Sequence, residues 1–322
     1  MLRREPLPLV ILGGRDRQPA ELPEGTTAHI LSGYKGMNLQ IGGEPLIAAV
    51  VRRYRSSGAF DPIWVAGPRE IYGEAVAGAE VIDTDGHLAA NLRATLHHLW
   101  NAGFSGALAF SSCDVLPEVD ELHILLEDYH AHAPSDYWMP QIRVPEDPSL
   151  LGASQYKPRY GLKTSRSSEP VDVLPGHLVI MRPEGFRYEL LFAYFEAVYV
   201  TRSTPLRRRV VIMGLRLLFY MLRKDFKTLL TGGGPGMTYE CGRHGYAIAR
   251  RLPREELTFE QLAYLVSRCF VRRSQRRQHP SWRGRMPLFD ALSLAKDIDT
   301  EEEAQEAQEA LGNLSTPGAE KP

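Results

Sequence analysis

The chain has 322 residues, of which 43% are hydrophobic and 24% are charged, a composition that is ordinary for a soluble globular enzyme. The formal net charge is −1, so the chain as a whole offers no electrostatic argument for nucleic acid binding. The three cysteines are widely spaced and odd in number, with no secretory signal before them. This usage argues against a disulfide framework and predicts a cytoplasmic protein.

The first element is a short apolar run over residues 9–12 that ends at Gly13 and Gly14. This pattern predicts a buried strand that opens into a loop whose backbone a ligand can approach closely. Lys35 follows, and Pro45 then leads an apolar-periodic stretch that predicts a helix. The order of these parts favours a polyphosphate site, although paired glycines after a strand are often only a tight turn.

Strand and helix signals alternate downstream and predict an α/β fold. Residues 63–66, 79–82 and 107–110 are strand candidates, and residues 91–100 and 122–132 have helical spacing. Asp114 follows the strand candidate at 107–110. A carboxylate at the carboxyl end of such a strand points into the crevice where ligands bind. Asp114 is therefore a candidate metal ligand, and a cap or turn aspartate is the alternative.

The middle of the chain has weaker signals. Residues 137–144 are a strand candidate, residues 143–171 are polar and rich in Pro and Gly and predict a loop, and residues 173–181 predict a turn followed by a strand. Helices are expected at 189–200, 206–230 and 257–271. The glycine-rich residues 231–245 predict a connector between helices, with a backbone nest for an anion as the alternative.

Residues 206–230 form a basic amphipathic pattern in which arginines and lysines alternate with large apolar residues. Its apolar stretches are too short to span a bilayer. Contact with a membrane surface, binding of an acidic partner and packing on the domain all remain open, with packing as the default. Residues 202–227 and 268–285 are basic whereas residues 297–322 are acidic. We expect the basic helices to lie over the active-site crevice and the acidic end to shield part of them.

Near the end of the chain, Asp297 and Asp299 directly precede a helix signal. Thr300 and Glu303 match a capping box, so the two aspartates are expected at a strand end just before that helix. Residues 312–322 are polar and are expected to be disordered.

Taken together, these motifs resemble the superfamily of nucleotidyltransferases that join a nucleoside triphosphate to a sugar phosphate, an alcohol phosphate or molybdopterin. The similarity covers residues 8–185 and 290–305. The matching residues are Gly13-Gly14, a basic Arg15 or Arg17, Lys35, the helix start Gly43-Glu44-Pro45-Leu46-Ile47, Asp114 with Pro117, and Asp297-Ile298-Asp299-Thr300. The chain departs from the family pattern in its long segment at 16–34 and in the three glutamates at 301–303.

The resemblance implies a Rossmann-like three-layer sandwich around a mostly parallel, mixed sheet. The core would comprise residues 1–186 and 289–311, with a helical insert at 187–288. The implied reaction is transfer of a nucleoside monophosphate from a nucleoside triphosphate to a phosphorylated small molecule, with release of pyrophosphate and dependence on Mg²⁺.

The same resemblance implies the roles of individual residues. Lys35 and Asp114 are the expected catalytic residues, and Mg²⁺ would be held by Asp114 with Asp297 or Asp299. On the acceptor side would lie Gly176 and His177, although a strand-edge histidine without catalytic duty is the alternative for His177. The implied nucleotide contacts are Leu12, Gly13, Gly14, Arg15, Arg17, Lys35, Gly86 and Asn91. A helix-capping role is the alternative for Asn91.

Two other interpretations stay open. A glycosyltransferase of related fold would bind a nucleotide sugar through a metal-bound Asp-x-Asp, but residues 114–116 lack the second aspartate. A non-catalytic nucleotide-binding or membrane-adaptor protein would instead use the basic helix at 206–230 as its working surface.

Overall fold

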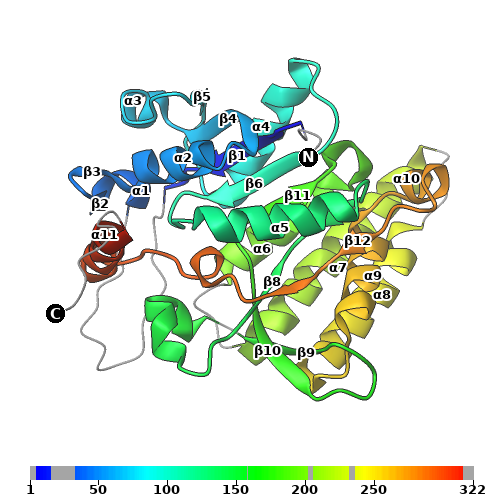
Figure 1. The fold of residues 1–322 in the computed structure, drawn as a ribbon. Helices are drawn as coiled ribbons and strands as arrows, with labels where there is room; N and C mark the ends of the chain where they lie inside the picture. Colours follow the sequence, from blue (N-terminus) through cyan, green and yellow to red (C-terminus); the bar gives the residue numbers. More distant parts are fainter. Residues whose placement is uncertain (1–4, 16–32, 158, 202–205, 232–235, 315–322) are drawn as a thin grey trace.

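The computed structural model describes residues 5–15, 33–157, 159–201, 206–231 and 236–314. A seven-stranded sheet in the order β12-β7-β11-β6-β1-β4-β5 forms its centre, with helices on both faces (Figure 1). The strands are β1 (Leu7–Leu12), β4 (Phe60–Gly67), β5 (Glu80–Asp83), β6 (Leu108–Ser112), β7 (Tyr137–Trp138), β11 (Val179–Met181) and β12 (Gly284–Arg285). The strands expected from residues 9–12, 63–66, 79–82 and 107–110 are therefore confirmed.

The central sheet is mixed and mostly parallel, as expected. Strand β1 pairs in parallel with β4 and β6, so that Val10 lies between Trp64 and Phe110. Strand β11 runs antiparallel to both β6 and β7. The parallel strands β1 and β6 are buried, with apolar residues facing both helical layers. Their carboxyl ends, at Leu12 and Ser112, open on the same edge of the sheet.

A second sheet in the order β13-β8-β10-β9 extends below the first in Figure 1, and β2 and β3 form a separate hairpin. The strands are β2 (Gln40–Ile41), β3 (Glu44–Pro45), β8 (Gln141–Arg143), β9 (Tyr160–Lys163), β10 (Pro170–Pro175) and β13 (Leu288–Phe289). The single strand expected at 137–144 is two strands, because Pro140 has no N–H to donate where the chain passes between the sheets. The predicted loop at 143–171 is also wrong in part, since it contains the 3₁₀ segment η1 (Pro148–Tyr156) and β9.

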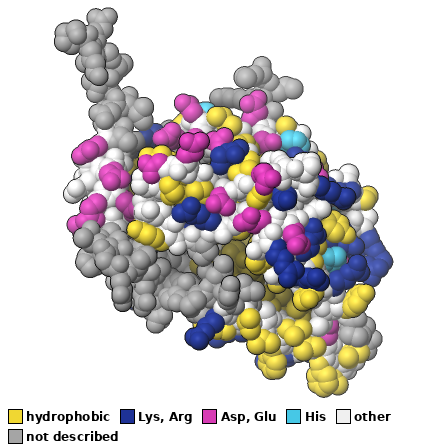
Figure 2. All heavy atoms as spheres, turned by 90° about the horizontal axis from the view of Figure 1, so that it is seen from below, with side chains coloured by type: hydrophobic (Ala, Val, Ile, Leu, Met, Phe, Trp, Pro, Cys, Tyr) yellow, Lys and Arg dark blue, Asp and Glu magenta, His cyan; other side chains and the backbone are white. Residues whose placement is uncertain are grey.

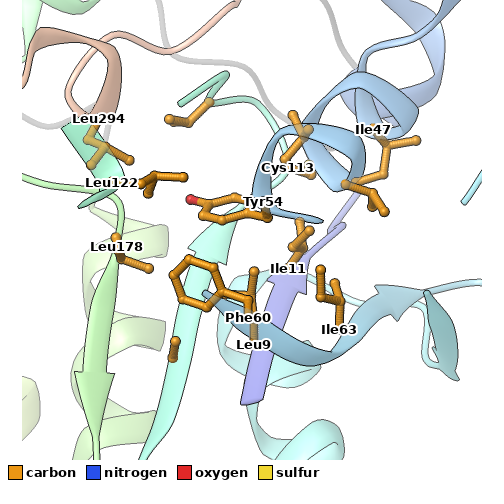
Figure 3. Close-up of a cluster of buried hydrophobic side chains, with 14 of the residues drawn as sticks. Leu9, Ile11, Ile47, Tyr54, Phe60, Ile63, Cys113, Leu122, Leu178 and Leu294 are labelled. Atoms are coloured by element: carbon orange, nitrogen blue, oxygen red, sulfur yellow. The ribbon is translucent and has the colours of Figure 1, made fainter. Parts of the chain in front are cut away.

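Helices on the two faces of the central sheet bury two separate cores. On one face α2 and α5 cover the cluster that includes Leu9, Tyr54 and Leu122 (Figure 3). Tyr54 is fully buried and its hydroxyl lies 2.6 Å from the Ser111 hydroxyl. On the other face α4, α6 (Tyr188–Val200) and α9 (Phe259–Phe270) cover the cluster around Leu96. The helices to this point are α1 (Lys35–Asn38), α2 (Leu46–Ser56), α3 (Arg69–Tyr72), α4 (Leu88–Asn101) and α5 (Val119–Ala131).

The helices of the third quarter of the chain pack beside the second core (Figure 1). They are α6 (Tyr188–Val200), α7 (Leu206–Leu230), α8 (Met237–Arg251), α9 (Phe259–Phe270) and α10 (Arg273–Gln278), with the 3₁₀ turns η2 (Pro183–Gly185) and η3 (Leu252–Arg254). The connector predicted at 231–245 is wrong from Met237 onward, because α8 starts there. Packing of α7 on the domain, the default interpretation, is right for Met221, Leu217 and Tyr220 and wrong for most of its apolar face, because many of its large side chains are exposed. No helix of the described residues is long and apolar enough to cross a membrane.

The C-terminal segment returns to the edge of the sheet where β1 and β6 end. After the 3₁₀ turn η4 (Leu292–Leu294), the strand expected before the last helix is absent. The Asp297 N–H donates to the Ser154 hydroxyl, and the Ile298 N–H donates to the Asp114 carbonyl at 2.7 Å, so these groups do not join a strand ladder. The capping box is confirmed, since Glu303 accepts from the Thr300 N–H and donates its own N–H to the Thr300 hydroxyl.

The last helix, α11 (Glu301–Leu314), makes the predicted disorder wrong for residues 312–314, and the rest of that stretch lies outside the described residues. Helix α11 packs on β2 and lies at the opposite end of the molecule from α10 (Figure 1). The expectation that the acidic end shields the basic helices is therefore wrong for α11. Local packing of its apolar side chain Ala304 on the first core decides its position.

Candidate functional site

The glycine-rich loop after β1 lies against the segment that leads into α4. The Gly13 N–H donates to the Ala66 carbonyl at 2.8 Å, and the Arg15 N–H donates to the Gly86 carbonyl at 3.4 Å. A Cβ at position 14 would lie 3.3 Å from Asn91 Nδ2 and 3.4 Å from the Gly86 oxygen. The structure thus brings Gly13, Gly14, Arg15, Gly86 and Asn91 together. Leu12, the last residue of β1, leads directly into this loop.

Arg17, the other basic residue expected here, lies outside the described residues. Arg15 places its guanidinium 5.7 Å from the ring centre of Tyr34, whose hydroxyl donates to Asp85 at 2.8 Å. Tyr34 and Asp85 were not expected from the sequence. They connect the loop after β1 to the segment that follows β5.

Asn91 does not cap α4, because the helix begins at Leu88 with His87 in the cap position. The capping alternative is therefore wrong. The Asn91 side chain is fully buried, and its Oδ1 accepts from the Thr84 hydroxyl at 3.0 Å. Its Nδ2 has no hydrogen-bond partner among the described residues. A buried amide donor without a partner is costly, so this group beside Gly14 is suited to a ligand.

Three potential metal ligands come together from distant parts of the chain. Asp114 follows β6, His177 lies between β10 and β11, and Asp297 lies between η4 and α11. One donor atom from each lies within 4.8 Å of the other two, and His177 Nε2 is 2.8 Å from Asp297 Oδ1. The bond between the Ile298 N–H and the Asp114 carbonyl holds the C-terminal segment against the end of β6.

Asp299 is paired with Lys35, the lysine that opens α1. Burial raises the pKa of Asp299, Asp297 and Asp114 raise it further, and Lys35 lowers it, with a net pKa of about 6. Burial lowers the pKa of Lys35, but Asp114, Asp299 and Asp297 outweigh burial and raise it. Lys35 is therefore a firmly charged cation among three carboxylates.

Lys157 is a functional candidate that the sequence analysis missed. Its ammonium group pairs with Asp297 Oδ2 and lies 3.5 Å from His177 Nε2. Burial raises the pKa of Asp297, but His177 and Lys157 outweigh burial and lower it. A lysine in the polar stretch at 143–171 is weak as a sequence signal, because lysines are common in loops. Only the folded structure, in which the C-terminal segment returns to this edge of the sheet, shows that Lys157 pairs with Asp297.

His177 and Gly176, the two residues expected on the acceptor side, have different structural surroundings. His177 joins the carboxylate cluster, and its backbone N–H donates to the Leu294 carbonyl at 2.8 Å. Gly176 donates its N–H to the Pro140 carbonyl at 2.8 Å, and a Cβ there would lie 2.9 Å from Pro140 Cγ. A glycine at 176 is therefore explained by close packing between β10 and β8.

The donor set fits a divalent cation. Oxygen atoms of Asp114 and Asp297 are the hard ligands that Mg²⁺ prefers. Burial is the first cause of the raised pKa of Asp299, and repulsion from Asp297 and Asp114 adds to it. A divalent cation would relieve that repulsion. His177 adds a nitrogen ligand, which is common for transition metals and unusual for Mg²⁺.

The layers, the mixed sheet and the loop after β1 define the chain as a Rossmann-like α/β protein with its candidate site at the carboxyl ends of β1 and β6. This fold is also found in a hypothetical transferase from Thermus thermophilus. The two are 15% identical with a TM-score of 0.53, over 93% of this chain and 100% of that chain. At this identity the similarity establishes the fold alone.

Weaker similarities reach other solved structures. A mannose-1-phosphate geranyltransferase, also from Thermus thermophilus, is 14% identical with a TM-score of 0.40, over 64% of each chain. The bifunctional IspDF from Campylobacter jejuni is 15% identical with a TM-score of 0.38, over 58% of this chain and 43% of that chain. Neither similarity is close enough to support an argument about this protein. No protein-family model and no curated protein matches the sequence.

Proposed function

We propose that this chain is a Mg²⁺-dependent nucleotidyltransferase that transfers a nucleoside monophosphate from a nucleoside triphosphate to a phosphorylated small molecule and releases pyrophosphate. One observation carries the proposal. Asp114 and the pair Asp297 and Asp299, from distant parts of the chain, gather around Lys35 at the edge of the sheet where the loop with Gly14 also lies. A carboxylate cluster, a charged lysine and a glycine-rich loop are parts that suit a metal-bound triphosphate.

The residues divide between the two substrates. The loop at Gly13 and Gly14 and the Asn91 amide would hold the nucleotide, and Lys35 would neutralise charge on the triphosphate as pyrophosphate leaves. Mg²⁺, when bound by Asp114 and Asp297, would supply positive charge that reduces the repulsion between the triphosphate and the attacking phosphate. The attacking phosphate is already ionised at neutral pH, so the site needs no general base.

Lys157 and His177 would serve the acceptor. Both pair with Asp297, whereas Asp299 pairs with Lys35, and Lys157 keeps about a third of its side chain exposed, with a relative area of 32%. A partly exposed lysine beside the carboxylate cluster is suited to a phosphate on the acceptor. The same groups hold Asp297 in place, so they also position a metal ligand.

The proposal includes a cytoplasmic location. The thiols Cys113, Cys241 and Cys269 are all free and buried, which fits a reducing compartment. Burial raises the pKa of Cys113 and of Cys269, so neither is suited to act as a nucleophile.

The test is a screen that pairs each nucleoside triphosphate with sugar phosphates and alcohol phosphates and measures pyrophosphate. We expect release that requires both substrates and Mg²⁺ and that stops with a chelator. A parallel screen with nucleotide sugars that released a nucleoside diphosphate would favour the glycosyltransferase instead. Nucleotide binding without turnover in either screen would favour a non-catalytic protein.

A further inference from the structure

Helix α7 packs on the protein through a single narrow stripe. Met221 and Asp225 are buried on this stripe, and Leu217 and Tyr220 pack against the small cluster that also includes Leu190 of α6. Asp225 is the only acidic residue in α7. Its carboxylate accepts from the backbone N–H groups of Met237, at 3.1 Å, and Thr238, at 2.8 Å, at the start of α8.

From Val211 onward the outward face of α7 is apolar, whereas the exposed Arg208 lies on the same face nearer the start of the helix. Its large hydrophobic side chains have exposed fractions of 36% to 72%, and Phe219 and Leu230 are the most exposed. The set is Val211, Ile212, Leu215, Leu218, Phe219, Leu222, Phe226, Leu229 and Leu230. At 100° per residue these positions fall in one sector of about 120°, turned away from the packed stripe. So many exposed large apolar residues in one contiguous face mark an interaction surface.

Cations border this apolar face. Arg216, Arg223 and Lys227 are all exposed, and they occupy the neighbouring sector of the same helix. Because Asp225 is buried and bound to α8, no acidic side chain of α7 reduces their charge at the surface. The exposed part of α7 therefore combines a hydrophobic sector with a purely positive one.

Helix α8 packs beside α7 and carries a row of exposed aromatic and basic side chains. Tyr239, Arg243, Tyr246 and Arg250 are exposed and recur with the spacing of one helix face, with exposed fractions of 75% for Tyr239 and 67% for Tyr246. Figure 2 shows hydrophobic side chains gathered in the right half of the view, the half that holds α7–α10, next to a cluster of lysines and arginines. Tyrosine and arginine are suited to the boundary between lipid tails and water.

We propose that α7 lies flat on an anionic lipid membrane, with its apolar sector among the acyl chains and Arg216, Arg223 and Lys227 at the headgroups. Charge complementarity selects this occupant. A surface of anionic lipid offers negative charge all along the border of the apolar sector. A second copy of the chain would instead bring one set of cations close to another. The inference does not depend on the proposed catalytic function.

The experiment is co-sedimentation of the full chain with two kinds of vesicle, neutral phosphatidylcholine and a mixture with about 40% phosphatidylglycerol, at about the 0.1 M salt that gives a Debye length of 10 Å. We expect binding to the anionic vesicles at least ten times stronger than to the neutral ones. The variant Phe219→Ser with Phe226→Ser should bind at least tenfold more weakly. Its matched control is Ile124→Ser with Leu150→Ser, two similarly exposed apolar residues on α5 and η1, which should bind as the wild type does.

A second pair of variants tests the charges. Arg216→Gln with Arg223→Gln should weaken anionic binding at least tenfold, whereas Arg53→Gln with Arg55→Gln on α2 should not. Unchanged thermal unfolding of each variant shows that folding is intact. Absence of binding to the anionic vesicles at this salt concentration, or equal loss of binding in the matched controls, would overturn the proposal. Sedimentation equilibrium that showed a dimer dissociated by the Phe219 and Phe226 changes, without vesicle binding, would assign the face to a second copy.

Discussion

Lys35 and Asp299 form an ion pair across 264 positions of the chain. The pair joins the first helical turn after the glycine-rich loop to the last segment before α11. Both groups are largely buried, and Asp114 and Asp297 add to the negative potential around Lys35. The part of the candidate site around Lys35 is therefore assembled only when the C-terminal segment has docked.

Replacement of this lysine tests the nucleotide side. Lys35→Ala should lower kcat/KM for the nucleoside triphosphate by about 100-fold, the size typical for loss of one group that stabilises developing charge. The KM for the acceptor should change little. Steady-state kinetics with each substrate varied in turn measures both effects, with Lys163→Ala on β9 as the control. An unchanged kcat/KM for the triphosphate would contradict the role of Lys35.

Asp114 tests the metal site. Asp114→Asn should reduce pyrophosphate release by about 100-fold or more, because the amide keeps the shape and loses the charge that holds Mg²⁺. The melting temperature should stay within about 3 °C of the wild type, which corresponds to about 1 kcal/mol. Asp290→Asn is the matched control, since Asp290 is 75% exposed and pairs with Arg143 at the surface. A variant that retained most of its activity would exclude Asp114 as a metal ligand.

Gly14 tests the approach of the nucleotide to the loop. A methyl group at this position would lie 3.3 Å from Asn91 Nδ2, in the space between the loop and the buried amide. Gly14→Ala should raise the KM for the triphosphate about tenfold, or about 1.4 kcal/mol, with little change in kcat. Gly242→Ala on α8, where a Cβ meets no atom within 4 Å, is the control and should leave kinetics unchanged. Equal KM values for both variants would show that nothing binds at Gly14.

Glu240 gives a pH-dependent contribution to stability that lies outside the site. Burial raises its pKa, but Arg187, at 2.6 Å, and Arg276 outweigh burial and lower the pKa. A carboxylate with a lowered pKa stabilises the fold above its unfolded pKa of about 4.3, and this contribution is lost as the pH falls through the folded pKa.

Glu240→Gln should therefore destabilise the protein by about 2 kcal/mol at pH 7, a typical value for hydrogen bonds to a charged group. The difference in the free energy of unfolding between the variant and the wild type should become smaller at about pH 3.5, below the unfolded pKa. Urea unfolding at both pH values measures it. The control is Glu184→Gln, an exposed residue 3.9 Å from Arg182, which should cost less than about 0.5 kcal/mol. A difference that stayed constant between the two pH values would mean that the charge of Glu240 is not the cause.

Interactions between residues close together in the sequence made several helices and strands predictable. The apolar run that ends at Gly13 predicts β1, and Pro45 marks the start of α2. The capping box of Thr300 and Glu303 predicts the start of α11. These signals work because hydrogen bonding at a helix start and burial of a short strand depend on neighbours in the chain. Asp114 could be singled out for the same reason, since it directly follows a buried strand.

Other features depended on segments that meet only in the folded chain. The sequence by itself determined the α/β order, the loop after β1 and the acidic pair at 297 and 299. The tertiary structure decided that Lys35 pairs with Asp299, that Lys157 reaches Asp297, and that the apolar face of α7 is left exposed. Periodicity shows which residues share a face of a helix, but it does not show whether another part of the chain covers that face. Likewise, a charged residue pairs with whichever oppositely charged side chain lies beside it in the folded protein. Which segments lie side by side is determined by long-range packing of the chain.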